Sequence, residues 1–215
     1  GGLYLYDLES GSLTTLLDVA QNAGTASISV SMLNGAAFAQ DNSQIMFYGS
    51  GSSIPAADGE ESFSIHGSIA VDGSGLKLTK PSGYEMEEMQ SSVSRLFFPQ
   101  TFTQADGTLL WVDRATGSAN TLSFSASGEG KDGVYGSEQG NYVATAVLGS
   151  NLTVRVYDVA SGALVATEVI ENSDPTYFYR IPRIYLLDGA KTAVVVLGGS
   201  IDELDTLVST FEFGA

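Results

Sequence analysis

A short sequence unit recurs along this chain and constrains its fold more than any other feature. Residues 6–13 read YDLESGSL, and residues 157–164 read YDVASGAL. Looser copies begin at Val71 (VDGSGL) and at Val112 (VDRATG). In each copy an apolar segment leads into an aspartate, which can accept backbone N–H groups two or three residues further on, and then into a glycine that tolerates positive φ. The unit therefore predicts a β-hairpin that is repeated four times.

The spacing between the aspartates of these units indicates the architecture. Asp113 and Asp158 lie 45 residues apart, and Asp72 and Asp113 lie 41 apart. Periods of about 40–50 residues with four strands each are typical of β-propeller blades. The 65 residues between Asp7 and Asp72 require an insertion, and residues 49–62 (GSGSSIPAADGEES) have the composition of a loop. We predict an all-β fold of β-propeller blades, in which four-stranded antiparallel repeats form a single domain or propeller fragment over residues 1–215.

Alternation of apolar and polar residues places the strands within each repeat. Val154 and Val156 should share one face, and Thr153, Arg155 and Tyr157 the other. One repeat lacks a clear first strand, and residues 85–92 are the only helix-like segment. The predicted strands are 34–40, 44–48, 63–71, 76–79, 95–103, 108–112, 121–125, 134–136, 142–148, 152–157, 164–170, 183–187, 192–197 and 207–213. The predicted core residues are Ile45, Phe47, Leu110, Val143, Val147, Val154, Val156, Val194 and Val196.

The number of strands at the two ends does not match a closed ring. Residues 2–18 supply two outer strands of a blade, and the last repeat supplies three strands. A ring that closes within one shared blade needs four strands there, so five are one too many. We therefore expect an incomplete propeller, either because flanking sequence lies outside these residues or because subunits pair edge to edge in an assembly.

Two segments resemble a known family. Residues 37–48 (AFAQDNSQIMFY) resemble the F-S-x-D-G-x-x-I-x-F strand pair of TolB-like propellers, and residues 69–79 (IAVDGSGLKLT) are similar to that family's hairpin ending in L-T. Similar blades form the amino-terminal propellers of prolyl-oligopeptidase-like peptidases. The resemblance implies a fold and carries no catalytic residue. One departure is Asp41-Asn42 in place of Asp-Gly, which a tight hairpin turn still tolerates.

Charge and composition exclude several partners. The chain has 25 acidic and 9 basic residues, a net charge of −16, and its few Lys and Arg are scattered. Nucleic acids and anionic membrane surfaces are therefore poor partners. No apolar run approaches the ~20 residues that a membrane helix needs. Cysteine is absent, which removes disulfides and thiolate chemistry. The acidic surface fits an extracytoplasmic protein, whether periplasmic, secreted or at the cell surface.

No catalytic or metal motif stands out. The only histidine is His66, in a predicted strand, and no G-x-S-x-G nucleophile elbow occurs, so we predict that residues 1–215 hold no hydrolase triad. The acidic clusters lie in predicted loops or the helix-like segment, where charge is normally solvated. We predict no cofactor, with calcium as the alternative because it prefers hard oxygen ligands. The candidate ligands are Asp58, Glu60, Glu61, Asp202 and Asp205, although none follows the D-x-D-x-D-G pattern.

The aromatic residues suggest a binding role. Tyr4 and Tyr6 alternate with leucines, so the two tyrosines should share one strand face. Most aromatic residues should pack between blades, while exposed ones can anchor an interface. We predict a non-enzymatic, extracytoplasmic propeller module that binds another protein or assembles with itself. The alternatives are the propeller domain of a serine peptidase whose catalytic domain lies outside this chain, and a carbohydrate-processing propeller that uses loop carboxylates.

Overall fold

The computed structural model describes residues 1–21, 23–55, 62–81, 86, 88–99, 107–125, 129–130, 132–171, 182–198 and 206–214. Within them every regular element is a β-strand, apart from one 3-10 turn, η1 (Val19–Gln21). No helical segment in these ranges has the length and apolar character needed to span a bilayer. The chain divides into two compact units, Gly1–Met89 with Arg114–Ser118, and Gln90–Asp113 with Ala119–Ala215.

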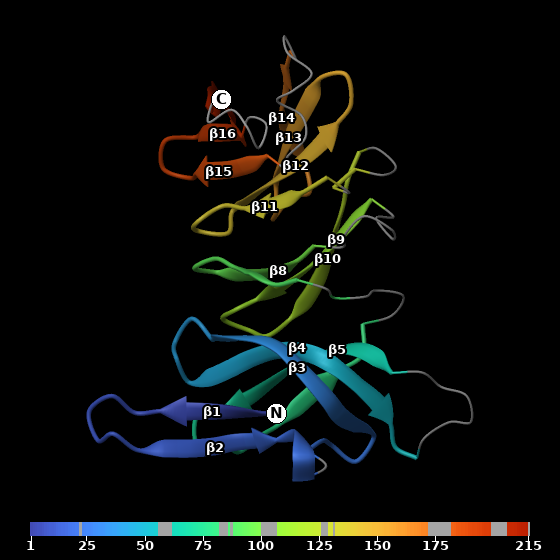
Figure 1. Cartoon of the computed structure of the whole chain (residues 1–215), viewed down its shortest axis with the longest axis vertical. Coiled ribbons are helices and arrows are strands. Elements are labelled where there is room, and N and C mark those ends of the chain that lie inside the picture. Colours follow the sequence, from blue (N-terminus) through green and yellow to red (C-terminus); the bar gives the residue numbers. More distant parts are fainter. Residues whose placement is uncertain are drawn as a thin grey trace. The chain divides into compact units, whose positions relative to one another are not determined.

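The first unit holds two antiparallel sheets (Figure 1). One is a hairpin, and the other has four strands in chain order, β3-β4-β5-β6, which is the topology of a propeller blade. The strands are β1 (Gly2–Tyr6), β2 (Leu13–Asp18), β3 (Ile28–Phe38), β4 (Gln44–Ser53), β5 (Phe63–Ala70) and β6 (Lys77–Thr79).

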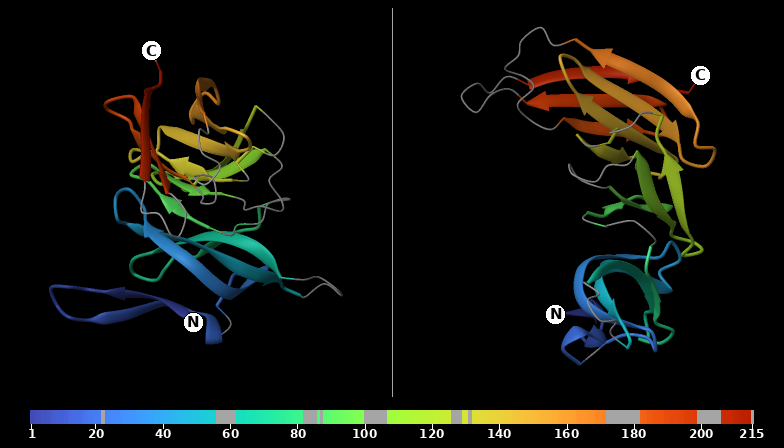
Figure 2. Two further views of the ribbon diagram at one scale, coloured as in Figure 1. Left: turned by 45° about the horizontal axis from the view of Figure 1, so that its top comes forward. Right: turned by 90° about the vertical axis from the view of Figure 1, so that its right-hand side faces the viewer.

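The second unit contains two further four-stranded sheets and one three-stranded sheet, all antiparallel and with neighbouring strands consecutive in sequence (Figure 2). The strands are β7 (Gln90–Ser91), β8 (Arg95–Phe98), β9 (Thr108–Asp113), β10 (Ala119–Ser123), β11 (Val134–Gly136), β12 (Tyr142–Leu148), β13 (Leu152–Asp158), β14 (Leu164–Ile170), β15 (Arg183–Leu187), β16 (Thr192–Gly198) and β17 (Thr206–Glu212). The prediction of an all-β fold built from propeller blades is confirmed.

The hairpin turns form as the repeat predicts. The carboxylate of Asp7 accepts the backbone N–H groups of Glu9 and Ser10 at 2.8 and 2.9 Å. Asp158 likewise accepts both the N–H and the hydroxyl of Ser161. The glycines of these turns have positive φ, from 66° at Gly75 to 84° at Gly73, with Gly11, Gly117 and Gly162 between them. Asn42, where the family has glycine, also adopts a positive φ of 59°.

Each unit has its own apolar core between facing sheets. In the first unit, Leu16 and Leu17 of the hairpin pack with Phe47 and Ile65 of the four-stranded sheet. In the second unit, one core lies around Phe97, Leu109, Leu122, Val143 and Tyr157, and another joins β12–β13 to β15–β16. Stacking of neighbouring sheets therefore buries the strand faces, as in a repeat architecture.

Six of the nine predicted core residues are buried: Ile45, Phe47, Leu110, Val143, Val154 and Val156. The prediction was wrong for β16, where Ala193, Val195 and Leu197 are buried while Val194 and Val196 are only partly buried. Val147 is also only partly buried. A continuous apolar run does not reveal which alternate residues face the core, because both registers look alike.

Two local predictions also differ from the structure. The segment predicted as a loop over residues 49–62 begins as strand, because β4 continues to Ser53 and pairs with both β3 and β5. Residues 56–61 of that segment lie outside the described ranges. In the helix-like segment, Gln90 and Ser91 form β7, the strand that sequence reasoning could not place. β7 has only two residues, both polar, so it carries no apolar pattern.

The first and last strands do not share a sheet. Within the described ranges β1 pairs only with β2, and β17 pairs only with β16. These strands therefore do not join the ends in one closing blade, as expected for an incomplete propeller.

Candidate functional site

The β1–β2 hairpin displays an exposed apolar face. The register pairs Tyr6 with Leu13 and Tyr4 with Thr15, so these side chains share one side of the hairpin. Tyr4, Tyr6 and Leu13 are 51%, 57% and 65% exposed. The alternate residues Leu3 and Leu5 pack against the core of the first unit. We call Tyr4, Tyr6 and Leu13 the tyrosine face; the sequence correctly placed its two tyrosines together.

A groove runs along β1 in the same unit. It has a volume of about 250 Å³ and is lined by Leu3, Tyr4, Leu5 and Tyr6 of β1 together with Ala36, Ala37, Phe38 and Ile45. No β2 residue lines it, so it lies on the side of β1 that faces away from β2. Phe38 is 41% exposed there. We call this the β1 groove; in the left view of Figure 2 the dark-blue hairpin extends away from the rest of its unit.

Acidic residues follow both strands that line the β1 groove, and the basic side chain of Arg114 also reaches it. Residues 1–76 contain no Lys or Arg, whereas Asp7 and Glu9 follow β1 and Asp41 follows β3. Hydrogen bonds from the backbone of Ser10 and Glu9 lower the pKa of Asp7, and those from the Ser43 hydroxyl and N–H lower the pKa of Asp41. Both carboxylates are therefore ionised at neutral pH. The Arg114 guanidinium is engaged by the Phe38 carbonyl oxygen, to which its Nε donates at 2.8 Å.

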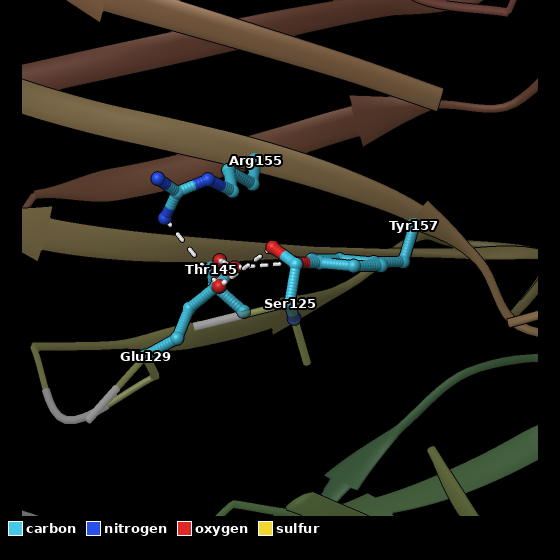
Figure 3. Close-up of polar contacts among 5 residues, drawn as sticks. All are labelled: Ser125, Glu129, Thr145, Arg155 and Tyr157. Atoms are coloured by element: carbon cyan, nitrogen blue, oxygen red, sulfur yellow. Dashed lines mark hydrogen bonds and ion pairs between the residues drawn. The ribbon is translucent and has the colours of Figure 1, made fainter. Parts of the chain in front are cut away.

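A buried carboxylate is the centre of a polar network in the described part of the second unit (Figure 3). Glu129, 1% exposed, accepts hydrogen bonds from the Thr145 hydroxyl at 2.5 Å and from the Tyr157 hydroxyl at 2.7 Å. The Arg155 guanidinium lies 3.4 Å from its other oxygen. Ser125 donates to Glu129 at 3.3 Å and its Oγ lies 2.7 Å from the Tyr157 hydroxyl.

This network can hold chain segments together, but its geometry is unsuited to activating a nucleophile. The exposed Ser125 hydroxyl lies beside the Tyr157 phenol and the Glu129 carboxylate, and that carboxylate already accepts two other hydroxyls and faces a guanidinium. Burial raises the pKa of Tyr157, so the phenol stays protonated and cannot take the serine proton at neutral pH. The Thr145, Tyr157, Ser125 and Arg155 groups donate to or face Glu129, so they offset its charge and fix the segment after β10 to β12 and β13.

A second groove, in the second unit, is polar and lacks carboxylates. It has a volume of about 560 Å³ and is lined by Trp111, Asn120, Thr121, Leu122, Ser123, Val159, Ala160, Ser161 and Gly162. The Arg95 guanidinium lies 4.9 Å from the centre of the Trp111 ring and donates to the Gly140 carbonyl oxygen. None of the nine lining residues has a side chain that exchanges a proton near neutral pH. The lining therefore offers no pair of groups for general acid–base chemistry.

The residues singled out from sequence are the candidate calcium ligands and the single histidine. The candidate calcium ligands Asp58, Glu60, Glu61, Asp202 and Asp205 lie outside the described residues, so the calcium prediction stays a prediction. His66 lies in β5 and is 9% exposed, and its Nε2 has no hydrogen-bond partner within the described part of the chain. Burial lowers its pKa, which keeps the imidazole neutral. Among the described residues no cluster of three or more His, Asp or Glu could hold a metal ion.

Comparison with known proteins supports the fold. No protein-family model and no curated protein sequence matches the chain. Among solved structures, an oligogalacturonate lyase in complex with manganese aligns with 98% of this chain and 56% of its own, at 9% identity and a TM-score of 0.58. The β-propeller domain of the Trilobed protease from Pyrococcus furiosus, described as having an open velcro topology, aligns with 85% of this chain and 55% of its own, at 10% identity and a TM-score of 0.51.

TolB from Acinetobacter baumannii aligns with 99% of this chain and 49% of its own, at 18% identity, but its TM-score of 0.47 is too low to carry an argument. Identities at this level show the fold alone. The chain spans about half the length of these structures. The fold and the hairpin units together define a protein of β-propeller blades. The fold-level resemblance to the propeller domains of peptidases is supported by the protease propeller.

Proposed function

We propose that this chain is a non-enzymatic, extracytoplasmic β-propeller module that binds a protein partner. The observation that carries the proposal is the tyrosine face, where Tyr4, Tyr6 and Leu13 are each more than half exposed on one side of a hairpin. Tyrosine is enriched at the energetic centres of protein interfaces because it buries a large ring while its hydroxyl keeps a hydrogen bond. Loops and hairpins on a rigid β scaffold commonly carry such recognition surfaces.

The net charge of the chain supports both the proposed extracytoplasmic location and a basic partner. A net charge of −16 keeps the module soluble and disfavours binding to nucleic acid or anionic lipid. The same charge attracts a basic partner and increases the rate of encounter at low salt. The acidic composition fits a periplasmic, secreted or surface-exposed module, which fractionation of the source cells would test.

Site-specific photo-crosslinking in the source cells tests the binding function. A photoreactive phenylalanine analogue replaces Leu13 on the tyrosine face or, as a control, Tyr185 of β15, which is 50% exposed on another sheet. We expect a discrete cross-linked protein from position 13 and none from position 185. Identical adducts from both positions, or none from position 13, would contradict the proposal.

The peptidase alternative depends on sequence outside these residues. Its support is the fold likeness to the propeller domain of a protease, together with the partial coverage of the longer structures. Sequencing the complete gene decides it: an adjoining α/β-hydrolase domain with a nucleophile elbow would establish this alternative. The carbohydrate-processing alternative needs two carboxylates facing one pocket within ~10 Å. Neither described groove is lined by two carboxylates, so no observation favours it.

A further inference from the structure

We infer that the polar groove of the second unit is a binding site for a neutral oligosaccharide. The groove is lined by Trp111, by four consecutive residues of β10, and by Val159–Gly162 in the turn between β13 and β14; we call it the β10 groove. The inference goes beyond the proposed function, because this groove and the tyrosine face lie in different units. The groove binds its ligand without cleaving it, since its lining has no pair of groups for acid–base chemistry.

The two walls of the β10 groove are internal parts of the chain. β10 is the outer strand of a four-stranded sheet, and the turn belongs to the next four-stranded sheet. Further described strands precede and follow this pair of sheets along the chain. Leu122 and Val159 belong to the buried core that joins the two sheets, so the walls are held in place. The groove volume of about 560 Å³ lies within the range of small-molecule sites.

The outer edge of β10 supplies fixed hydrogen-bonding groups. The N–H of Phe124 donates at 2.6 Å to the carbonyl oxygen of the residue that precedes β9. Because antiparallel strands alternate, the backbone groups of Thr121 and Ser123 then face away from β9. The next outward N–H, that of Ser125, donates to the Tyr157 hydroxyl at 3.0 Å. Thr121 and Ser123 instead line the β10 groove, which therefore presents N–H donors and C=O acceptors close together.

The short length of this edge favours a sugar over an added peptide strand. The Tyr157 hydroxyl occupies the outward N–H of Ser125, so only Thr121 and Ser123 direct outward backbone groups into the groove. A peptide that adds a strand to a sheet uses a longer row of such groups. Each hydroxyl of a sugar is both a donor and an acceptor, and neighbouring hydroxyls lie close together on the ring. A sugar can therefore pair with both kinds of group at two residues.

Trp111 supplies an aromatic surface for the ring of a sugar. The Arg95 guanidinium lies over the indole, 4.9 Å from its centre, and donates to the Gly140 carbonyl oxygen, which fixes the position of the indole. Arg95 is not a lining residue, so the groove meets another part of the indole. Within the described part of the chain the indole N–H donates to no other group. An indole can pack against the C–H groups of a sugar while its N–H donates to a hydroxyl.

The charges around the β10 groove select a neutral ligand. The chain has 25 acidic and 9 basic residues, but none of the nine lining residues is charged. Two charged side chains lie beside the lining. Arg95 is engaged by Trp111 and Gly140, and the Asp158 carboxylate accepts the N–H and the hydroxyl of Ser161. These two opposite charges attract each other. An acidic sugar would find no cation in the lining and would be repelled by the net charge of −16.

The first test uses the fluorescence of Trp111, which is the only tryptophan of the chain and therefore reports on this groove. The full chain is titrated with neutral trisaccharides of glucose, xylose, mannose and N-acetylglucosamine, and with the trisaccharide of galacturonic acid as the charged control. We expect a saturable change in emission with at least one neutral trisaccharide and none with the charged one. No saturable change with any neutral trisaccharide, or equal binding of the charged one, would overturn the inference.

The second test fills the groove. Ala160 is an exposed lining residue of the turn, and Ala115 is the exposed residue at the same position of the repeat unit that begins at Val112. We expect Ala160→Phe to bind the trisaccharide about tenfold more weakly than the wild type, because the new ring occupies the space of the sugar. Ala115→Phe is the matched control and should bind as the wild type does. Equal affinities of the two variants, at equal melting temperatures, would overturn the inference.

The third test changes the backbone of β10. Thr121→Pro removes an N–H that faces the groove, and Thr121→Ala is the matched control that loses the side chain but keeps this N–H. We expect Thr121→Pro to bind about two- to tenfold more weakly than Thr121→Ala, the effect of one hydrogen bond. If the two variants are equally stable and bind equally, the β10 edge does not hold the ligand and the inference is wrong.

Two further outcomes separate this inference from its rivals. A neutral peptide that alternates valine with threonine probes strand addition at the same edge. If this peptide changes the emission of Trp111 and no trisaccharide does, the occupant is an extended peptide and the sugar site is wrong. If a trisaccharide binds while cross-linking from position 13 captures no partner, the sugar site stands and the proposed function fails.

Discussion

At the scale of single residues, the repeated aspartates stabilise the hairpin turns by accepting hydrogen bonds from the residues that follow them. Asp7, Asp41 and Asp72 each accept hydrogen bonds from residues two or three positions later, and these bonds lower the pKa of all three carboxyls. Asp, Ser and Gly at these spacings are sufficient to predict the turns, because every interaction involved is local. This part of the structure was therefore fully accessible from sequence.

The lowered aspartate pKa values predict a pH dependence of stability. Each carboxyl has a lower pKa in the folded chain than its ordinary value of 3.8, so its contribution is present above that pH and is lost as the pH falls below it. Asp72→Asn removes the charge at one turn. We expect this variant to melt below the wild type at neutral pH and the difference to shrink toward zero in acid, as followed by circular dichroism. A difference that stays constant from neutral to acidic pH would contradict the assignment.

The buried Glu129 predicts a large effect of substitution. Glu129→Ala leaves the donors of Thr145, Tyr157 and Arg155 without their acceptor. Removing one partner of a buried ion pair costs about 3–5 kcal/mol of unfolding free energy. Glu138→Ala, at an exposed position of the same unit, is the control and should change stability by less than about 0.5 kcal/mol. Urea denaturation measures both, and similar values for the two variants would show that the network contributes little.

At the scale of elements, strands were predicted best where alternation and turn residues agree. The bounds of β11, β12, β14 and β15 match the sequence prediction. The end of β4 was missed because its Gly and Ser residues suggest a loop. At Gly49 a Cβ would lie 1.9 Å from the Met32 carbonyl oxygen, so β3 and β4 approach too closely for any side chain. Composition cannot distinguish this close approach from a flexible turn, because both favour glycine.

The close approach of β3 and β4 predicts that glycine is required at position 49. In Gly49→Ala the new methyl group would collide with backbone atoms, which cannot move without disturbing the pairing. We expect a loss of about 1–3 kcal/mol in unfolding free energy, typical of overpacking. Gly189→Ala is the control, since no atom lies within 4 Å of its added Cβ. Equal stability of the two variants by urea denaturation would argue for a loop at residue 49.

The burial of β13 predicts that a charge on its core face unfolds the domain. Val154 is 0% exposed and packs among the residues of the core that joins β12–β13 to β15–β16. Val154→Asp places an unpaired carboxylate there, at a cost of several kcal/mol. Val169→Asp, on β14 and 50% exposed, should fold normally. The thermal unfolding transitions distinguish them, and a Val154→Asp protein that melts within a degree or two of the wild type would refute the strand assignment.

At the scale of the whole molecule, the sequence predicted the architecture but not the surfaces. The position of Tyr4 and Tyr6 on the same face of β1 follows from the alternation of side chains along a strand. The β1 groove requires β1 and β3 to meet across the core of the first unit, and no sequence pattern encodes that packing. The Glu129 network joins residues from three separate segments, so neither spacing nor composition identifies it.

The environment of the single histidine predicts that the full 215-residue chain has no hydrolase activity of its own. A catalytic histidine must hydrogen-bond both its nucleophile and an orienting carboxylate. In the described structure His66 is buried in β5, and its Nε2 contacts neither a hydroxyl nor a carboxylate at hydrogen-bond distance. The Ser125 hydroxyl is instead beside the Tyr157 phenol, whose pKa is raised by burial, and the Glu129 carboxylate, which is already held by the Thr145 and Tyr157 hydroxyls. We therefore expect no turnover of a panel of peptide and ester substrates above the uncatalysed rate; turnover that disappears in both His66→Ala and His66→Gln, with both variants folded, would refute this prediction.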